Sequence, residues 1–132
     1  MSACDSGRSR GYEKQAGATM NIRNAILSTA SLFEVRPGAL DFTKYTVPQD
    51  PSGVGCPLSW IGYYFGMKGN AVNVAGTFVP TDGTIGSAQS HFFRRMDEIA
   101  GTNKWIEDAA ICAKTLRYYA DMYHGEDVRI AA

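Results

Sequence analysis

The chain has no excess charge of either sign. Its 13 Lys and Arg residues are balanced by 13 Asp and Glu residues, so the formal net charge at pH 7 is zero. Proteins that bind nucleic acid draw much of their affinity from cationic side chains that neutralise phosphates. Because this chain lacks a basic excess, we expect nucleic acid not to be among its partners.

Cysteine and histidine are scarce. The three cysteines, Cys4, Cys56 and Cys112, lie far apart and form no Cys-x-x-Cys motif, and the chain has two histidines. An odd number of widely spaced cysteines argues against a disulfide framework and a structural zinc site, and is typical of a reducing compartment. A metal site needs three or four converging ligands. We therefore expect a cytoplasmic protein without a metal or other cofactor.

Long apolar runs and nucleotide-binding motifs are also missing. The first nineteen residues lack the apolar centre of a secretory signal. Residues 51–67 carry no charge, but this stretch is shorter than the roughly 20 apolar residues that span a membrane. Phosphate loops, dinucleotide fingerprints and the Ser-His-Asp elbow do not occur. We expect a soluble protein with no membrane partner.

The 132 residues of the chain are enough for one domain. Residues 1–19 are rich in Ser, Gly, Ala and mixed charges, and Tyr12 is their only large apolar residue apart from the initial Met1. Such a segment cannot bury enough apolar surface to order itself. We predict a flexible N-terminal extension over residues 1–19 and a single compact domain over residues 20–132. The extension is either an artefact of an upstream start codon, with Met20 the working start, or an arm that binds a partner.

The apolar periodicity predicts four helices. The first ends near Glu34, the third before Gly101 and the last near Tyr123. Pro57 suits the first helical position of the second helix. Capping preferences place the starts of the four helices at Asn21, Cys56, Ser87 and Asn103.

Two segments between these helices are less regular. Residues 39–55 form a long loop, and we expect its aromatic side chains to anchor it to the core rather than to contact a ligand. Residues 71–79 alternate like a strand, but Gly76 interrupts the pattern. A small hairpin, an irregular segment and one helical turn all stay open there. The predicted fold class is mainly α: a small four-helix domain with a long first loop and room for one short β-hairpin.

The start of the second helix carries the main candidate for catalysis. A thiol at a helix N-terminus experiences the positive end of the helix dipole, which lowers its pKa. Residues 53–55 read Gly-Val-Gly, a lead-in that lets backbone N–H groups face an oxyanion. This short pattern resembles the nucleophile helix of papain-like cysteine hydrolases. The resemblance implies Cys56 as nucleophile with His91 or His124 as base. The alternative is that Cys56 is a small buried residue.

Tyrosine supplies the remaining signal. Five of the seven tyrosines lie on the predicted helices, which is more than the inner faces of four helices can bury: Tyr63, Tyr64, Tyr118, Tyr119 and Tyr123. Tyrosine is enriched at interfaces because its apolar ring carries a polar tip. Tyr118 and Tyr119 either form a surface for a protein partner or a homodimer, or are ordinary half-buried tyrosines. A pocket between the second helix and residues 39–55 would instead make the chain a small-molecule binding module. The candidate ligand or partner surface consists of Tyr45, Trp60, Tyr64, Tyr118 and Tyr119.

A second, wider pattern consists of Gly53, Cys56, Trp105, Asp108, Leu116 and Arg117. A glycine and a cysteine before a helix, then Trp-x-x-Asp opening an Ala-rich helix with Leu-Arg, are similar to a group of small bacterial and phage proteins of unknown function. The likeness spans Ile22 to roughly Ala120. The chain departs from it at Leu58, Ser59 and Trp60, where the group has small residues. The resemblance implies a bacterial or phage accessory protein and no activity.

The leading hypothesis is a non-enzymatic, soluble, intracellular protein-interaction protein. The main alternative is a small cysteine-dependent hydrolase or transferase that uses Cys56.

Overall fold

The structure is a computed structural model that describes residues 21–79 and 87–123. The predicted extension over residues 1–19 and the candidate base His124 lie outside these residues. The described part of the chain is helical and has no strand, which confirms the mainly α prediction. It contains five α-helices where we predicted four. The elements are α1 (Ile22–Val35), η1 (Pro37–Ala39), α2 (Pro57–Phe65), α3 (Ala71–Phe78), α4 (Ala88–Ala100), η2 (Lys104–Ile106) and α5 (Ala109–Met122), where η marks a 3₁₀ helix.

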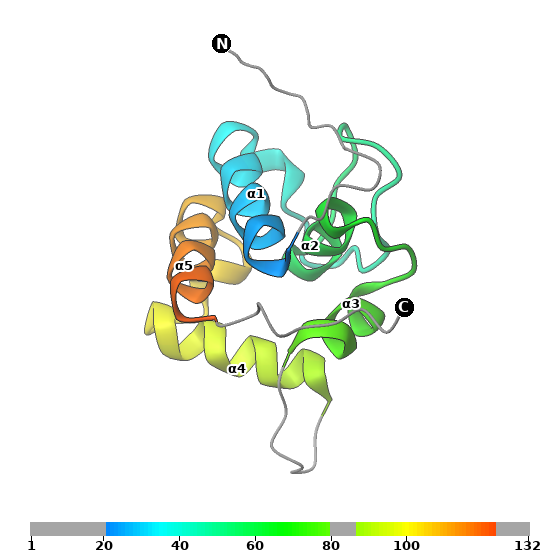
Figure 1. Ribbon diagram of the computed structural model, residues 1–132. Coiled ribbons are helices and arrows are strands. Elements are labelled where there is room, and N and C mark those ends of the chain that lie inside the picture. Colours follow the sequence, from blue (N-terminus) through cyan, green and yellow to red (C-terminus); the bar gives the residue numbers. More distant parts are fainter. Residues whose placement is uncertain (1–20, 80–86, 124–132) are drawn as a thin grey trace.

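The five α-helices pack in a closed circuit around one core. Helix α1 packs on α2 and α5, α2 on α3, α3 on α4, and α4 on α5. Figure 1 shows α1 and α5 running side by side in opposite directions, with α4 lying across the end of the pair. The largest side chains inside the circuit are Trp60, Trp105, Phe33 and Phe92. Helices α1, α3, α4 and α5 each keep exposed residues on their outer sides, whereas α2 has none.

Caps fix where most of these helices begin. Asn21 and Ser87 each accept a hydrogen bond from the backbone three residues later, as predicted. The prediction that Asn103 caps the last helix is wrong. The chain first forms η2, in which Trp105 is buried, and α5 starts after Asp108. Asp108 is the cap because its Oδ1 accepts from the N–H groups of Ala110 and Ile111.

The hairpin considered for residues 71–79 is also wrong, because this segment is helix α3. Asn70 and Asn73 form a reciprocal capping box at its start. Inner positions 71, 74, 75 and 78 are buried, which is a helical period. Val72, which strand alternation would group with Val74, is exposed instead.

The long loop over residues 39–55 is held along its length. A parallel bridge joins Leu40 to Gly55, and an antiparallel bridge joins Thr46 to Asn70. The ring of Phe42 packs on Phe93 and Trp105, with ring centroids 5.2 and 5.8 Å away. This packing confirms that the loop is anchored to the core through an aromatic side chain.

Candidate functional site

Cys56 lies at the N-cap of α2, as predicted, but its surroundings differ from those of a nucleophile. Its side chain is fully buried and makes no capping hydrogen bond. Its backbone N–H donates to the Lys44 carbonyl at 2.9 Å, so this group is not available to an oxyanion. Pro57 has no N–H to offer. The long loop thus occupies the position that a substrate would need.

Burial also reverses the expected acidity of this thiol. Removal from water raises the pKa of Cys56 above its usual range, because a thiolate is poorly solvated there. Hydrogen bonds from the backbone and side chain of Ser59 oppose this shift without overcoming it. The pKa of Cys112 is raised as well, mainly by burial and secondarily by Cys56. The expectation that the helix dipole activates Cys56 is therefore wrong.

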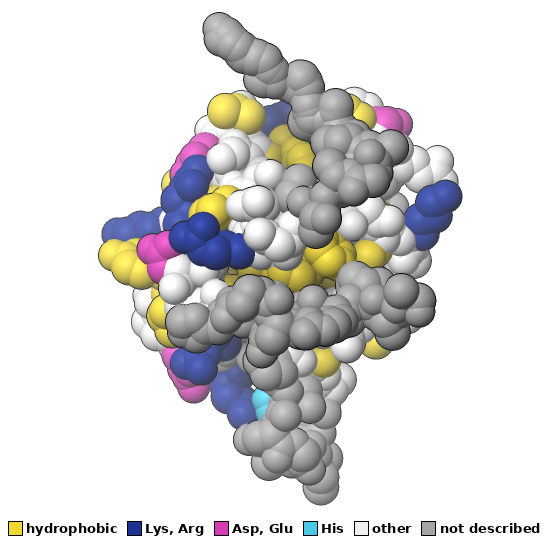
Figure 2. Space-filling model, in the orientation of Figure 1, with side chains coloured by type: hydrophobic (Ala, Val, Ile, Leu, Met, Phe, Trp, Pro, Cys, Tyr) yellow, Lys and Arg dark blue, Asp and Glu magenta, His cyan; other side chains and the backbone are white. Residues whose placement is uncertain are grey.

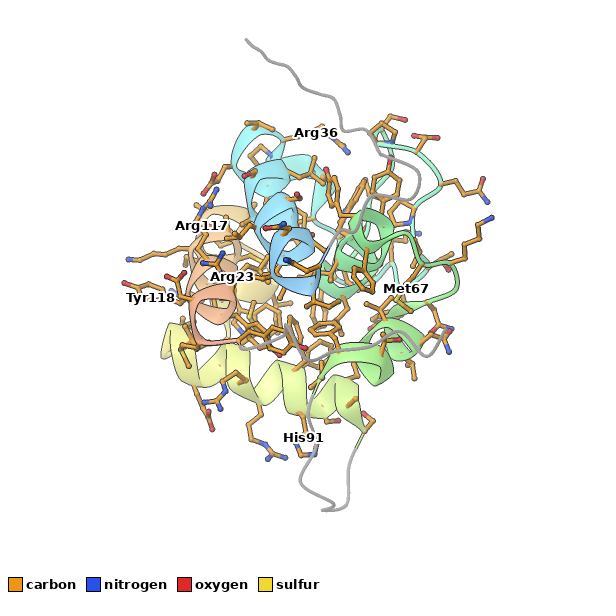
Figure 3. The ribbon with its side chains drawn as sticks, viewed as in Figure 1. Arg23, Arg36, Met67, His91, Arg117 and Tyr118 are labelled. Carbon is orange, nitrogen blue, oxygen red and sulfur yellow. The ribbon has the colours of Figure 1, made fainter. Side chains whose placement is uncertain are left out.

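His91 is not placed to act as a base for Cys56. It lies on the outer side of α4, as Figure 3 shows, and no hydrogen bond joins it to Cys56. Its Nε2 is enclosed but has no hydrogen-bond partner among the residues that the structure describes. Helix α4 packs on α3 and α5, whereas Cys56 is covered by the loop before α2.

The candidate surface residues divide into exposed and buried groups. Tyr45 and Tyr118 are 46% and 53% exposed, as a contact surface requires. Tyr64 is half-buried. Trp60 is fully buried and Tyr119 is 6% exposed, so placing these two on a surface was wrong. Tyr119 is buried because its ring packs between Phe92 and Tyr123, at 5.1 and 5.9 Å.

Two exposed apolar residues accompany the exposed tyrosines and were missed. Val72, at the start of α3, is 54% exposed, and the neighbouring Ala71 N–H donates to the Tyr45 carbonyl at 2.8 Å. Met122 is 49% exposed and lies one turn after Tyr118 on α5. The spacing of Met122 from Tyr118 was visible in the sequence. The position of Val72 was not, because it follows from the helical form of residues 71–78.

A third missed residue is Arg36, which joins the long loop to α2. Its Nη2 donates to the carbonyls of Pro51 and Gly53, at 2.6 and 2.8 Å. Its guanidinium lies over the Trp60 ring, 5.9 Å from the ring centroid. Nothing in the sequence around Arg36 indicates carbonyl partners 15 and 17 residues away.

The pocket considered between the long loop and α2 has no support at the places where these two segments meet. A Cβ added at Gly55 of the loop would overlap the Ser59 hydroxyl of α2, and one added at Gly62 of α2 would lie 3.1 Å from a methyl group of Val47 in the loop. The Trp60 indole, a candidate lining group, already donates to the Ala39 carbonyl at 2.9 Å. The loop therefore lies directly on the helix there.

Two further features bear on the class of site. No three His, Cys, Asp or Glu side chains within residues 21–79 and 87–123 come together to hold a metal ion. None of the helices described is both long enough and apolar enough to cross a membrane.

Comparison of the chain with protein-family models, curated proteins and solved structures gives no match. The resemblance to small bacterial and phage proteins stays a prediction.

Proposed function

We propose that this chain is a non-enzymatic cytoplasmic protein that binds a protein partner through Tyr45 and Val72. These two residues are named here the loop surface. The observation that carries the proposal is that both apolar side chains are about half exposed and come from segments joined by backbone hydrogen bonds. The buried free thiols of Cys56 and Cys112 are compatible with a reducing compartment.

The backbone beneath the loop surface is fixed before any partner binds. The Val47 N–H donates to the Gly69 carbonyl at 2.9 Å, and the Thr46–Asn70 bridge lies between this bond and the one to Tyr45. The neighbouring Phe42 ring contacts Tyr45 edge-on at 6.5 Å. A preorganised surface loses less conformational entropy on binding, so more of the contact energy appears as affinity.

The chemistry of the loop surface fits a protein partner. Tyrosine is a frequent anchor of protein interfaces, since it buries a large ring with few rotatable bonds. Lys44 and Lys68 are exposed, and each directly precedes one of the two segments that meet here. We infer that Tyr45 enters a pocket of the partner and that the lysines lie at a polar rim.

The catalytic alternative has less support. It requires an accessible thiolate, whereas Cys56 is enclosed and its pKa is raised.

Site-specific photo-crosslinking tests the proposal. A photoreactive phenylalanine analogue replaces Tyr45 in one variant and Val35, which is 82% exposed at the end of α1, in a control variant. Both variants are expressed in the source cells and irradiated. We expect one discrete protein adduct from position 45 that position 35 does not give. Excess wild-type chain should suppress it, and excess Val72→Asp chain should not.

Identical adducts from positions 45 and 35, or none from position 45, would refute the loop surface. If the Val72→Asp chain suppresses the adduct as strongly as the wild-type chain does, Val72 is not part of the loop surface.

A further inference from the structure

The outer side of α5 is a continuous exposed stripe. Its spacing of three and four residues keeps the members on one face of the helix. Tyr118 and Met122 are its large apolar members, and a 14-residue helix extends over about 21 Å. The stripe, named here the outer α5 face, consists of the exposed Ala110, Lys114, Tyr118, Asp121 and Met122 and the half-buried Arg117.

Two charges on this face lie symmetrically about a point between Arg117 and Tyr118. Lys114 lies about one turn before the midpoint between Arg117 and Tyr118, and Asp121 lies about one turn after it. If two such helices met antiparallel about a two-fold axis at that midpoint, Lys114 of each would lie opposite Asp121 of the other. An isologous interface requires this kind of self-complementarity.

Arg117 and Tyr118 fit the same geometry. Tyr118 of one copy would lie opposite Arg117 of the other, a pairing of a cation with an aromatic ring. The two Arg117 side chains would approach each other near the axis. Their charge is balanced within each copy, because Arg117 donates to both carboxylate oxygens of Glu34, at 2.7 and 2.9 Å.

The side chains of this face stay accessible despite their contacts within the chain. Asp121 accepts from Arg23 at 3.1 Å, yet its side chain is 66% exposed. Figure 3 shows Arg23, Arg117 and Tyr118 on the same side of the molecule, along α1 and α5. In Figure 2, Lys and Arg side chains alternate there with acidic and hydrophobic ones.

We propose that the outer α5 face pairs with the same face of a second copy, so that the chain forms an antiparallel α5–α5 homodimer. The charge pattern favours this occupant over an unrelated protein, since antiparallel pairing of two identical helices places Lys114 of each copy opposite Asp121 of the other. The outer α5 face shares no residue with the loop surface, whose residues come from other elements.

A charge-exchange experiment tests the dimer. The Lys114→Glu variant would place two carboxylates opposite each other at both ends of the interface, and the Asp121→Lys variant would place two ammonium groups there. In sedimentation equilibrium over a series reaching high micromolar concentrations, we expect the wild type to dimerise. Each variant should associate at least about tenfold more weakly, because both of its intermolecular pairs are of like charge.

An equimolar mixture of the two variants should restore a dimer. In that heterodimer, the introduced glutamate of one chain lies opposite the introduced lysine of the other, and the unchanged Asp121 lies opposite the unchanged Lys114. Lys68→Glu is the control, and it should dimerise like the wild type. Circular dichroism melts identify any variant that has lost its fold. If one of the two charge variants has lost its fold, Tyr118→Glu, another change on the exposed face, replaces that variant in the homodimer test.

Three results would overturn the proposal: a monomeric wild type throughout the series, folded variants that dimerise like the wild type, or a mixture that stays monomeric. The Val72→Asp variant should dimerise normally, so loss of the dimer and loss of partner binding at the loop surface are read separately.

Discussion

Trp60 links two parts of the chain through a buried polar contact. Its indole N–H donates to the carbonyl of Ala39, at the end of η1, and its ring lies under the Arg36 guanidinium. The surrounding rings of Tyr63 and Tyr64 lie 5.3 and 6.2 Å from it. A buried indole needs a hydrogen-bond partner, and here the start of the long loop supplies it.

Replacement of Trp60 by Phe tests this link. The variant loses one hydrogen bond and part of a buried ring, so we expect the free energy of unfolding to fall by about 1–3 kcal/mol. Tyr64→Phe, which removes a hydroxyl from a half-buried side chain, should change it by less than about 0.5 kcal/mol. Urea unfolding measures both. Equal urea midpoints for Trp60→Phe and wild type would show that the indole does not hold the loop.

Burial of Trp60 was predictable in part, because it belongs to an uncharged stretch. The hydrogen bond to Ala39 was not, since the two residues are 21 positions apart and meet only through the fold. Cys56 shows the same limit. Its N-cap position follows from the neighbouring Pro57, but its pKa depends on the loop that covers it. The local sequence pattern predicts where in a helix a residue lies, but it does not predict which distant segment covers that residue.

At the scale of elements, α3 shows how helical periodicity can be hidden in a short segment. In this eight-residue segment the even-numbered positions carry Val72, Val74 and Phe78, and that pattern fits both a strand and a helix. The capping box between Asn70 and Asn73 is the local feature that decides for the helix, since it satisfies backbone N–H groups at the start. Both asparagines were visible in the sequence, three residues apart.

Two glycines offer a matched test of how α3 packs. Gly62 on α2 faces α3, and a Cβ there would overlap Val74 and approach Val47. Gly76 on α3 has open space around it. We expect Gly62→Ala to destabilise the fold by about 1–3 kcal/mol through overpacking. Gly76→Ala should stabilise it by up to about 1 kcal/mol, because alanine is the better helix former.

Thermal unfolding of the two variants beside wild type gives the sign of each change. A Gly62→Ala variant as stable as wild type would mean that α2 and α3 do not approach closely at this point. A loss of stability in Gly76→Ala would mean that its surroundings are not open.

At the scale of the whole molecule, α1 and α5, the first and last helices of the described chain, pack on each other and close the circuit of helices. Two exposed ion pairs, Arg23–Asp121 and Glu34–Arg117, connect these helices. Apolar repeats in the sequence predicted helices where α1, α2, α4 and α5 lie, and the buried residues of α1 recur at that spacing. They did not predict which helix each face meets, because apolar faces are interchangeable without tertiary information.

The whole fold also buries some reactive and apolar side chains and leaves other apolar side chains exposed. The two free thiols of the described residues and both tryptophans are buried, while apolar side chains of α3, α5 and the long loop are exposed. The central claim is that this chain acts through its surface and that Cys56 belongs to its core.

Native-state alkylation of Cys56 tests this claim most directly. The full chain is treated with iodoacetamide over a pH series, and mass spectrometry of its peptides follows each cysteine separately, with glutathione as the reference thiol. We predict that Cys56 reacts no faster than the protein unfolds and that urea exposes it. Rapid labelling in the native protein, with an apparent pKa below the ordinary value of about 8.5, would contradict the account and return Cys56 to the role of nucleophile.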